Sequence, residues 1–417
     1  MSALAAWLAR QERSHPSSID LGLARVREVA SRLGLLAARP GITITVGGTN
    51  GKGSTVAFLD GILRAAGRRV GRFTSPHLSR YNERICIDGH EASDDALIAS
   101  FERIDAARGD VTLTFFEYNA LAALDLFAQA RVEVSVLEVG LGGRLDATNI
   151  IDADVAIVTS IGIDHVEWLG STREEIGREK AGIFRAGRPA VLGSADMPHS
   201  IYDSIAAIGA RAVVPGRDFE ARPRGELWDF ICGEFQLRDL PRPVLNGGHQ
   251  IGNAATALAA LVRADLSLQL TSSVVAHALL TTRIRGRFQI LPGDVEWVLD
   301  VAHNVPAAEG LRDNLAGLPR RRTLAVCGVL GDKDIAGITQ VLAASVDAWI
   351  IAGLQGPRAV SADDLRARLP RGAQVIGAEP DVAAACRAAR AAAMPGDRIV
   401  VFGSFLTVGP ALEFLGI

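Results

Sequence analysis

The glycine-rich stretch at residues 48–55 constrains the fold of this chain more than any other part of its sequence. It reads Gly-Thr-Asn-Gly-Lys-Gly-Ser-Thr and lies between a short β-branched run at 42–46 and an apolar, helix-like segment at 56–66. A loop of this kind between a strand and a helix can hold phosphate oxygens, because its backbone N–H groups approach them closely. The start of the helix adds a favourable electric field. The stretch therefore predicts an α/β domain with a phosphate-binding loop.

Within this loop, Lys52 can bridge the β- and γ-phosphates of a nucleotide, and Ser54 or Thr55 can bond to phosphate or to a metal ion. The spacing departs from the usual pattern, because Gly53 displaces the first hydroxyl by one residue. The alternative is a glycine-rich turn with an exposed lysine. The strand–loop–helix setting favours phosphate binding over that alternative.

Apolar runs alternate with helix-like segments along the rest of the chain. The runs at 132–139 and 155–159 are rich in β-branched residues and lack polar alternation, which is typical of strands buried on both faces of a parallel sheet. A stretch rich in arginine and proline at 222–243 predicts a small β-hairpin. Further elements are expected as strands at 70–73, 295–299, 323–329, 348–351, 373–376 and 398–402, and as helices at 253–262, 362–368 and 382–393.

The rhythm of strands and helices restarts near residue 285. We therefore predict an α/β protein with two domains. The first, at 1–284, is a P-loop-containing domain with a mostly parallel sheet. The second, at 285–417, is a smaller Rossmann-like α/β domain.

Composition excludes several classes of protein. With 48% hydrophobic and 22% charged residues, the chain has the balance of a globular protein and not of a disordered one. The net charge of −3 and the 5% aromatic content argue against nucleic acid as a partner, because phosphate backbones bind basic surfaces and bases stack on aromatic rings. The four cysteines form no CxxC pair, which suits a reducing compartment.

The N-terminal stretch lacks the pattern of a signal peptide, and no apolar run approaches the ~18 residues of a membrane span. No large apolar surface stripe stands out in the sequence. We therefore expect a soluble, cytoplasmic protein that acts as a monomer, without a membrane partner.

Polar residues follow several of the expected strands, where a parallel sheet binds its ligands. Glu138, near the end of the run at 132–139, is the hard carboxylate that Mg²⁺ takes beside a triphosphate; a strand-end acid on the surface is the alternative. His165 and Ser75 also follow strands, but each alone is more often a structural or turn residue. Lys180 would by default be a solvated helical lysine. A neutral lysine amine can instead take up CO₂ and become a carbamate, an anionic metal ligand.

These blocks together resemble one family, the dihydrofolate synthase/folylpolyglutamate synthase family of the Mur-ligase superfamily. The resemblance rests on ten blocks in the same order: GTNGKGST at 48–55, TSPHL at 74–78, YNERI at 81–85, FFEYNALAAL at 115–124, LEVGLGGRLDATN at 137–149, SIGIDH at 160–165, REKAGIF at 178–184, RGRFQ at 285–289, LDVAHN at 299–304 and GSF at 403–405. The unusual position of Gly53 is the family's own form of the loop.

The resemblance implies an amide ligase that depends on ATP and on Mg²⁺, with two ions expected. ATP would phosphorylate a carboxylate, and the amine of L-glutamate would attack the acyl phosphate. The resemblance places Gly51, Lys52, Gly53 and Ser54 on the triphosphate. It places Ser75 and Glu138 on one Mg²⁺, and His165 and a carbamylated Lys180 on the second. It places Asn253 and Arg287 on the nucleotide and Asp300 near the ribose.

His303 would lie close to the reacting phosphate, and with Lys52 and Lys180 it is a catalytic candidate. It could accept the proton of the glutamate amine, or it could only orient phosphate. His303 and Asp300 could also be plain strand-end caps. The intermediate hydrolyses easily, so we expect a cleft between the two domains that closes on ATP and excludes water. In that arrangement the second domain forms the glutamate and nucleotide side.

The sequence resembles the bifunctional bacterial type, which makes dihydrofolate from dihydropteroate and also extends reduced folates. In that type three segments line the pterin and pteroate pocket, here Asp20, Leu21 and Gly22; Thr114, Phe115, Phe116 and Glu117; and Leu145, Asp146 and Ala147. Asp20 could accept from the pterin N–H groups, and Phe115 or Phe116 could stack on its ring. As alternatives, Asp20 could be the N-cap of the next helix and the phenylalanines could be core.

Several other functions remain as alternatives. A folylpolyglutamate synthase with a single activity has the same chemistry. Another Mur-type amino-acid ligase would be expected to carry an additional N-terminal domain, whereas the phosphate loop here begins at residue 48. A P-loop switch would have no use for the second α/β domain. A catalytically inactive binding protein would not be expected to retain Lys52, Glu138 and Lys180.

Overall fold

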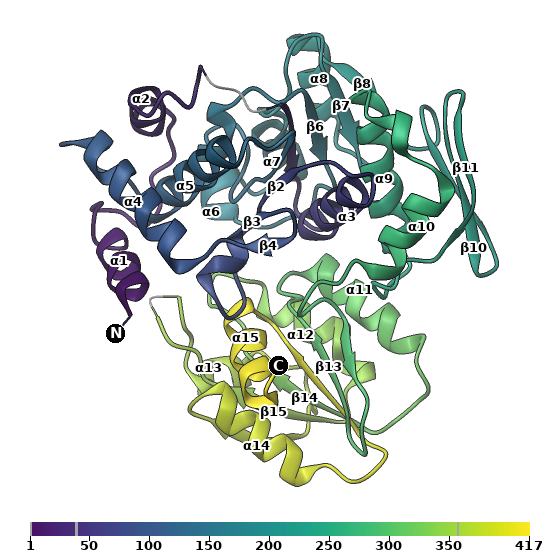
Figure 1. Ribbon diagram of the computed structural model, residues 1–417. Helices are drawn as coiled ribbons and strands as arrows, with labels where there is room; N and C mark the ends of the chain where they lie inside the picture. The colour runs from purple at the N-terminus through teal and green to yellow at the C-terminus, as the bar shows by residue number, and fades with distance from the viewer. Residues whose placement is uncertain (1, 38–40, 357) are drawn as a thin grey trace. The chain divides into compact units, whose positions relative to one another are not determined.

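The chain divides into two units, of which the first contains the phosphate loop (Figure 1). The computed structural model describes residues 2–37, 41–356 and 358–417. The first unit comprises the chain up to His77 together with 81–244 and 251–282; the second comprises 78–80, 245–250 and 283–417. Met1, with which the predicted first domain starts, lies outside the described residues.

An eight-stranded sheet organises the first unit, in the order β4-β3-β2-β5-β1-β6-β7-β8. The strands are β1 (Ile42–Gly47), β2 (Val70–Phe73), β3 (Ile85–Ile87), β4 (His90–Glu91), β5 (Val134–Glu138), β6 (Val155–Val158), β7 (Pro189–Leu192) and β8 (Arg211–Val213). All pairings from β2 across to β8 are parallel, and β3 and β4 form an antiparallel edge. The mostly parallel α/β architecture predicted for this part of the chain is confirmed.

The register of the central strands places the phosphate loop. Strand β1 lies between β5 and β6, with Val46 paired to Glu138 and Gly47 paired to Val158. The segments that follow these three strands therefore emerge side by side at the carboxyl edge of the sheet, where doubly wound α/β proteins bind ligands.

Helices cover both faces of this sheet (Figure 1). They are α1 (Ala3–Gln11), α2 (Ala24–Arg32), α3 (Lys52–Ala65), α4 (Asp94–Arg108), α5 (Phe115–Ala130), α6 (Val166–Leu169), α7 (Arg173–Ala181), α8 (His199–Ile208), α9 (His249–Arg263) and α10 (Ser272–Thr281), with 3₁₀ turns η1 (Tyr81–Arg84), η2 (Ala147–Ile150) and η3 (Ser267–Gln269). One core cluster joins α1, α2, α4 and α5, and it includes Phe101, Leu121 and Phe127. Gly71 on β2 makes this packing possible, since a Cβ there would lie 2.6 Å from the Phe127 ring.

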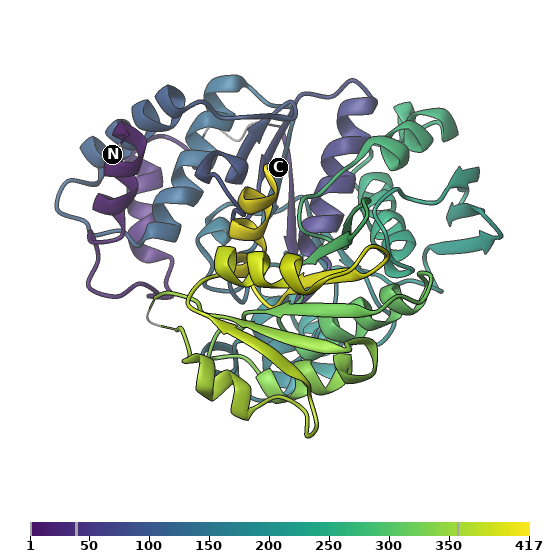
Figure 2. The same cartoon turned by 90° about the horizontal axis from the view of Figure 1, so that it is seen from below.

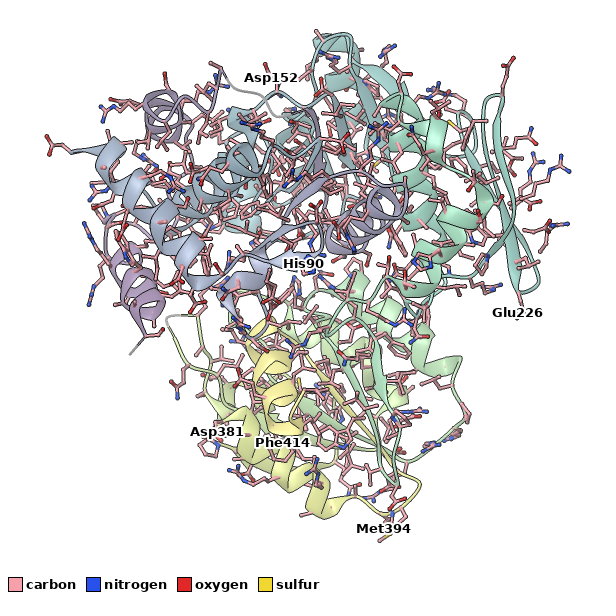
Figure 3. The ribbon with its side chains drawn as sticks, viewed as in Figure 1. His90, Asp152, Glu226, Asp381, Met394 and Phe414 are labelled. Atoms are coloured by element: carbon pink, nitrogen blue, oxygen red, sulfur yellow. The ribbon has the colours of Figure 1, made fainter. Side chains whose placement is uncertain are left out.

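A three-stranded antiparallel sheet, β11-β10-β9, stands where the hairpin was predicted. Its strands are β9 (Glu220–Arg224), β10 (Leu227–Cys232) and β11 (Phe235–Pro241), so the prediction was right in kind and one strand short. The side chains of Trp228 and Phe230, on β10, are fully buried, so one face of the sheet is covered. Glu226 extends from the turn between β9 and β10, with its side chain 96% exposed (Figure 3).

The second unit has a six-stranded sheet in the order β12-β13-β17-β14-β15-β16, and its strands run side by side in Figure 2. The strands are β12 (Gln289–Leu291), β13 (Glu296–Asp300), β14 (Thr323–Cys327), β15 (Ala348–Ala352), β16 (Val375–Glu379) and β17 (Arg398–Phe402). Only β12 pairs antiparallel among them. The helices of this unit are α11 (Val305–Ala316), α12 (Ile335–Leu342), α13 (Ala362–Ala367), α14 (Val382–Ala392) and α15 (Phe405–Leu415), with the 3₁₀ turn η4 (Ala343–Ser345).

Helix boundaries differ from the expected ones at the phosphate loop. The helix expected at 56–66 begins at Lys52, because Gly51 takes the left-handed N-cap position with a φ of 87°. Glycine and β-branched residues hid this first turn from the sequence pattern. Among the described residues, none of the helices combines the length and the apolar composition that crossing a bilayer requires.

Candidate active site

The phosphate loop joins β1 to α3 through two glycines with positive φ, Gly48 at 136° and Gly51 at 87°. At Gly48 a Cβ would lie 2.0 Å from Thr159 Oγ1, so a side chain there has neither the conformation nor the room that it needs. The loop is therefore built against the segment that follows β6.

Several hydrogen bonds hold the loop to that segment, and three of them involve Thr159 and Ser160 as follows. The N–H of Thr49 donates to the Ser160 carbonyl at 2.8 Å, and the N–H of Asn50 donates to Ser160 Oγ at 3.1 Å. Thr159 Oγ1 donates to the Asn50 carbonyl at 2.6 Å. Neither residue was among the predicted site residues, although Thr159 ends an expected strand and Ser160 follows it, a signal that could have found both.

Two lysines meet at one carbonyl of the loop. Lys52 Nζ donates to the Gly48 carbonyl at 3.0 Å, and Lys180 Nζ donates to the same oxygen at 2.9 Å. Lys52 also donates to the Thr49 carbonyl at 3.2 Å. Lys180 is 5% exposed, so its default assignment as a solvated lysine is wrong.

Burial, and then the charge of Lys52, lower the pKa of Lys180 to about 7, against the opposing effects of Asp164 and Asp146. An ordinary lysine titrates near 10.5. A substantial fraction of the Lys180 amine is therefore neutral near pH 7, which is the form that can react with CO₂.

Glu138 and Ser75 lie at the carboxyl ends of neighbouring strands. The Glu138 side chain is buried at 4% exposure, so the surface alternative for it is wrong, and its Oε2 accepts the Ser75 N–H at 3.3 Å. The Thr55 hydroxyl, in the first turn of α3, is buried without a hydrogen-bond partner among the described residues. These hard oxygen donors fit Mg²⁺.

His165 has a φ of 51° and precedes α6. Its backbone N–H donates to Asp164 Oδ1 at 2.8 Å. No group of three or more His, Cys, Asp or Glu side chains with metal-binding geometry occurs within 2–37, 41–356 and 358–417. A cation at this edge of the sheet would therefore depend on oxygens from a nucleotide or from water for much of its coordination.

Asn253, on α9, faces the phosphate loop. A Cβ on Gly51 would lie 2.9 Å from Asn253 Oδ1, so the amide borders the mouth of the loop. A residue that contacts the nucleotide would lie at this position, at the mouth of the phosphate loop.

In the second unit, Asp300 ends β13 and organises the backbone around it. Its Oδ2 accepts the Phe288 N–H at 2.8 Å, and its Oδ1 accepts the Ala302 N–H at 2.8 Å. Burial raises the pKa of this carboxyl, and the nearby Arg287 charge opposes that shift. Asp300 therefore does cap the end of a strand, which was the alternative role considered for it.

His303 and Arg287 lie beside Phe405. The Arg287 guanidinium stands 5.4 Å from the centre of the Phe405 ring, and the His303 ring stands 6.3 Å from it. His303 Nδ1 donates to the Val301 carbonyl at 2.7 Å, which leaves the lone pair of a neutral imidazole on Nε2.

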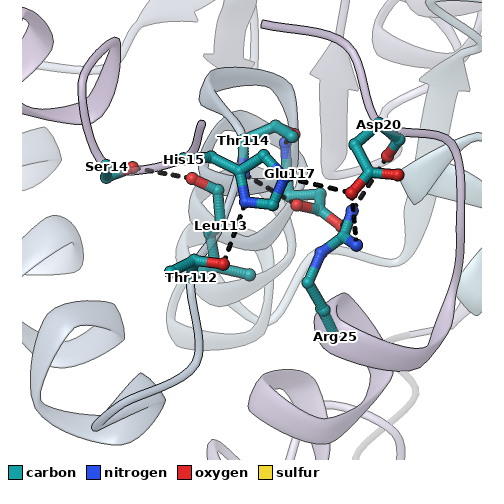
Figure 4. A network of polar contacts seen from close by, with 8 residues as sticks. All are labelled: Ser14, His15, Asp20, Arg25, Thr112, Leu113, Thr114 and Glu117. Atoms are coloured by element: carbon teal, nitrogen blue, oxygen red, sulfur yellow. Dashed lines mark hydrogen bonds and ion pairs between the residues drawn. The ribbon is translucent and has the colours of Figure 1, made fainter. Parts of the chain in front are cut away.

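Asp20 belongs to a network of polar contacts that joins the first segments of the chain to α5 (Figure 4). Its Oδ2 is bonded by Arg25 Nη1 at 2.7 Å and by His15 Nε2 at 3.0 Å. Arg25 Nη2 also reaches Glu117 Oε1 at 3.3 Å, and His15 Nδ1 lies 2.9 Å from Thr112 Oγ1. The sequence analysis missed His15 and Arg25.

The alternative that Asp20 caps the next helix is wrong. Helix α2 begins at Ala24, its N-cap is Leu23, and no side chain caps it. Leu21 and Gly22 are half-buried in the connection that leads to this helix.

The first turn of α5 carries the second predicted pocket segment. Thr114 and Glu117 form a capping box, in which each side chain accepts the N–H of the other, at 3.2 and 2.7 Å. Phe115 and Phe116 are half-buried at the edge of the core cluster. The Phe116 ring packs against that of Phe73, with the ring centres 5.8 Å apart and the planes tilted by 52°.

Asp146 shapes the third predicted segment. Its carboxylate accepts the N–H groups of Gly140 and Leu141, at 3.0 and 2.9 Å, and both the N–H and the hydroxyl of Thr148, at 3.0 and 2.7 Å. Burial raises the pKa of this carboxyl, which the four donors oppose. Leu145 beside it is half-buried, and Ala147 is buried.

Known protein families match most of the chain. Residues 46–222 match the Mur ligase middle domain, and residues 286–405 match the Mur ligase glutamate ligase domain. Among curated relatives, the dihydrofolate synthase/folylpolyglutamate synthase of Escherichia coli is 47% identical over 415 residues, covering 99% of this chain and 96% of the relative. The enzyme of the same name from Haemophilus influenzae is 40% identical, covering 98% of this chain and 96% of the relative.

Solved structures show the same likeness. Escherichia coli FolC in complex with DHPP and ADP superposes with a TM-score of 0.93 at 46% identity, covering 100% of this chain and 98% of that one. The bifunctional enzyme from Yersinia pestis, complexed with AMPPNP and Mn ion, superposes with a TM-score of 0.92 at 46% identity, covering 100% and 99%. The chain therefore belongs to the dihydrofolate synthase/folylpolyglutamate synthase family of Mur ligases.

Proposed function

We propose that this chain uses ATP to join L-glutamate to dihydropteroate, and also to reduced folates. The observation that carries the proposal is full-length likeness to bifunctional enzymes, at 47% identity, in a chain whose phosphate loop is built against two lysines. The relative solved with DHPP and ADP, and another solved with Mn, AMPPNP and L-glutamate, support these substrates.

The reaction transfers a phosphoryl group before it forms an amide. A carboxylate oxygen of the acceptor attacks the γ-phosphorus, and ADP leaves. The amine of L-glutamate then attacks the acyl phosphate, and inorganic phosphate leaves. Charge develops on phosphoryl oxygens in the first step, so the site needs cations and N–H donors more than it needs a base.

In this proposal the phosphate loop holds the triphosphate through Gly51, Lys52, Gly53 and Ser54. Lys52 exchanges its bonds with the Gly48 and Thr49 carbonyls for bonds with phosphate oxygens. Asn253 contacts the nucleotide at the mouth of the loop.

We propose Ser75 and Glu138 as ligands of one Mg²⁺, and His165 with carbamylated Lys180 as ligands or supports of a second. Bound Mg²⁺ would offset the charge of the phosphoryl oxygens. The neutral amine of Lys180 attacks CO₂, a C–N bond forms and the nitrogen releases a proton, which converts a neutral buried group into an anion. The lowered pKa of Lys180, about 7, supports this step.

For the second domain, residues 285–417, we propose the glutamate and nucleotide functions. Arg287 contacts the nucleotide and Asp300 lies near the ribose. His303 accepts the proton of the glutamate amine through Nε2, or orients phosphate. The first domain, residues 1–284, binds ATP and the folate substrate.

For the acceptor, Asp20 binds the pterin N–H groups, with Leu21 and Gly22 beside it, and Phe115 or Phe116 stacks on the ring. Thr114, Glu117, Leu145, Asp146 and Ala147 complete the pocket. The substrates are small molecules, and we expect the enzyme to act as a monomer in the cytoplasm, without nucleic acid.

The test is ADP release by the purified protein with Mg-ATP and L-glutamate, with the product identified by mass. ADP coupled to a dihydropteroate–glutamate adduct would establish dihydrofolate synthase activity, and a reduced folate in a parallel sample would test chain extension. ADP with the reduced folate alone would mean a single activity and would remove the role of Asp20. If no ADP is released with either acceptor, the assignment of substrates is overturned.

A further inference from the structure

Arg84, in the turn η1, is a buried cation, 8% exposed. The carboxylates of Glu138 and Glu83 act on it electrostatically, but no ion pair within 4.0 Å joins it to an Asp or Glu among the residues that the structure describes. Buried guanidinium groups in proteins are nearly always paired, because an uncompensated charge loses its hydration without return. The guanidinium can therefore still bind an anion at close range.

The surroundings of Arg84 fix its guanidinium in place without neutralising it. The group stands 5.4 Å from the centre of the Phe115 ring and 5.8 Å from that of Tyr81. Its Nε donates to His77 Nδ1 at 2.8 Å, so His77 accepts as a neutral imidazole.

The position of Arg84 joins two parts of the candidate site. Phe115, whose ring centre lies 5.4 Å from the guanidinium, is proposed to stack on the pterin. Glu138 is a proposed metal ligand, and its carboxylate acts electrostatically on Arg84, as does that of Glu83. An acceptor that stacked on Phe115 and reached a triphosphate beside Glu138 with its acid end would bring its carboxylate into the surroundings of this arginine.

We propose that Arg84 binds the carboxylate of the acceptor substrate, the group that ATP phosphorylates. This rests on the proposed function and deepens it. A guanidinium offers two parallel N–H donors to a carboxylate, which fixes both its distance and its orientation. Its charge offsets the repulsion between the carboxylate and the triphosphate as they approach, and Arg84 keeps its protons throughout.

The experiment compares dihydropteroate with its carboxamide analogue, which lacks the charge and keeps the shape. Calorimetry in the presence of Mg-ADP would measure both affinities for the natural enzyme and for Arg84→Gln. We expect the natural enzyme to prefer the acid by about 30-fold or more, and Arg84→Gln to reduce that preference to about threefold or less. A merely structural role for Arg84 would weaken both ligands equally.

Turnover provides a second readout. We expect kcat/KM for dihydropteroate to fall about 100-fold in Arg84→Gln, with the KM for ATP nearly unchanged. Arg103→Gln is the matched control, because Arg103 forms an ion pair with Asp125 on the outer helices and lies outside the site. If Arg84→Gln fails to fold, Arg84→Lys tests the same preference, since it keeps the charge and loses the paired donors.

The outcomes separate the two proposals. If the natural enzyme forms no adduct from dihydropteroate or from a reduced folate, the proposed function fails, and the role of Arg84 fails with it. If the natural enzyme turns over but the variant keeps the full preference for the acid, the role of Arg84 alone is overturned.

Discussion

A single oxygen atom organises the charged residues of the candidate site. The Gly48 carbonyl accepts from both Lys52 and Lys180, which brings two ammonium groups to one acceptor in a buried place. Their repulsion adds to the desolvation that already disfavours the charged form of Lys180. The pKa of Lys180 is therefore lowered first by its burial and then by the neighbouring charge of Lys52.

Replacing Lys180 with alanine should abolish turnover, because the proposed carbamate would be lost. In the natural enzyme, ¹³C-labelled bicarbonate should give a carbamate resonance and support activity in buffers otherwise free of CO₂. Both the resonance and the bicarbonate dependence should be absent from Lys180→Ala. Unchanged activity in that variant would remove the carbamate from the mechanism.

The stability of the folded chain should also depend on Lys180. Its pKa is lowered on folding from 10.5 to about 7, so between these values the unfolded state holds a proton that the folded state has released. Stability relative to Lys180→Met should therefore rise with pH from about 7 to 10.5, by up to about 1.4 kcal/mol per pH unit, and stay level below about 7. Denaturant unfolding in CO₂-free buffer measures this difference, and a flat difference across the range would contradict it.

Glu138→Ala should lose nearly all turnover at ordinary Mg²⁺ concentrations, by about 1,000-fold or more, because the proposed hard ligand would be missing. ADP release measures this directly. Glu133→Ala is a control next to the same strand, since Glu133 bonds Arg68 at the surface, and it should change the rate less than about twofold. Retained turnover in Glu138→Ala would exclude it as a metal ligand.

At the scale of elements, the sequence predicted most of the strands that are buried on both faces, because continuous β-branched runs distinguish them. It did not predict β3, β4, β8 and β12, whose two or three residues carry too little pattern to be recognised, nor the buried four-residue strand β7, which begins with a proline. The ends of β1, β5 and β6 could be placed together from the logic of parallel sheets. The partners His15 and Arg25 could not, since the bond from Arg25 to Glu117 spans 92 positions of the chain.

The loop and the segment after β6 should behave as one element. Gly48→Ala should weaken Mg-ADP binding at least tenfold, because a Cβ meets Thr159 Oγ1 at 2.0 Å and the φ of 136° disfavours alanine. Calorimetry measures the affinity. Gly67→Ala is the matched control: its φ of 78° is also positive, but nothing lies within 4 Å of the added Cβ, so it should cost about 1 kcal/mol of stability and leave ADP binding intact. Equal binding in the two variants would argue against the clash.

At the scale of the whole molecule, each unit has a sheet and hydrophobic clusters of its own. The resemblance of ordered sequence blocks predicted the family, and the comparisons confirm it. Composition alone could not have done so, because it describes an ordinary globular chain. What the sequence leaves for experiment is the set of residues that meets each substrate.

Mg-ADP at about 100 times its dissociation constant should stabilise the chain by about 2.7 kcal/mol. That corresponds to a rise of about 3–5 °C in the melting midpoint, the lower figure for the whole chain and the higher one for the first unit unfolding alone. Lys52→Ala should remove most of this shift, whereas Arg64→Ala, in the last turn of the same helix, should keep it. Scanning calorimetry with and without nucleotide measures both, and an undiminished shift in Lys52→Ala would contradict the proposed role of Lys52.

The small sheet β9–β11 has a consequence for how concentrated protein behaves. Strand β9 is one of its two outer strands, and at Pro223 it has no N–H to offer to another chain. Arg222 and Arg224 flank that proline, and both are already ion-paired, to Glu220 and to Asp229. A strand from a second copy that approached β9 would find no N–H donor at Pro223, and it would meet a charged arginine on either side of that proline. This border therefore resists edge-to-edge aggregation, so crowding of the enzyme should not convert the exposed strand into a template for fibres.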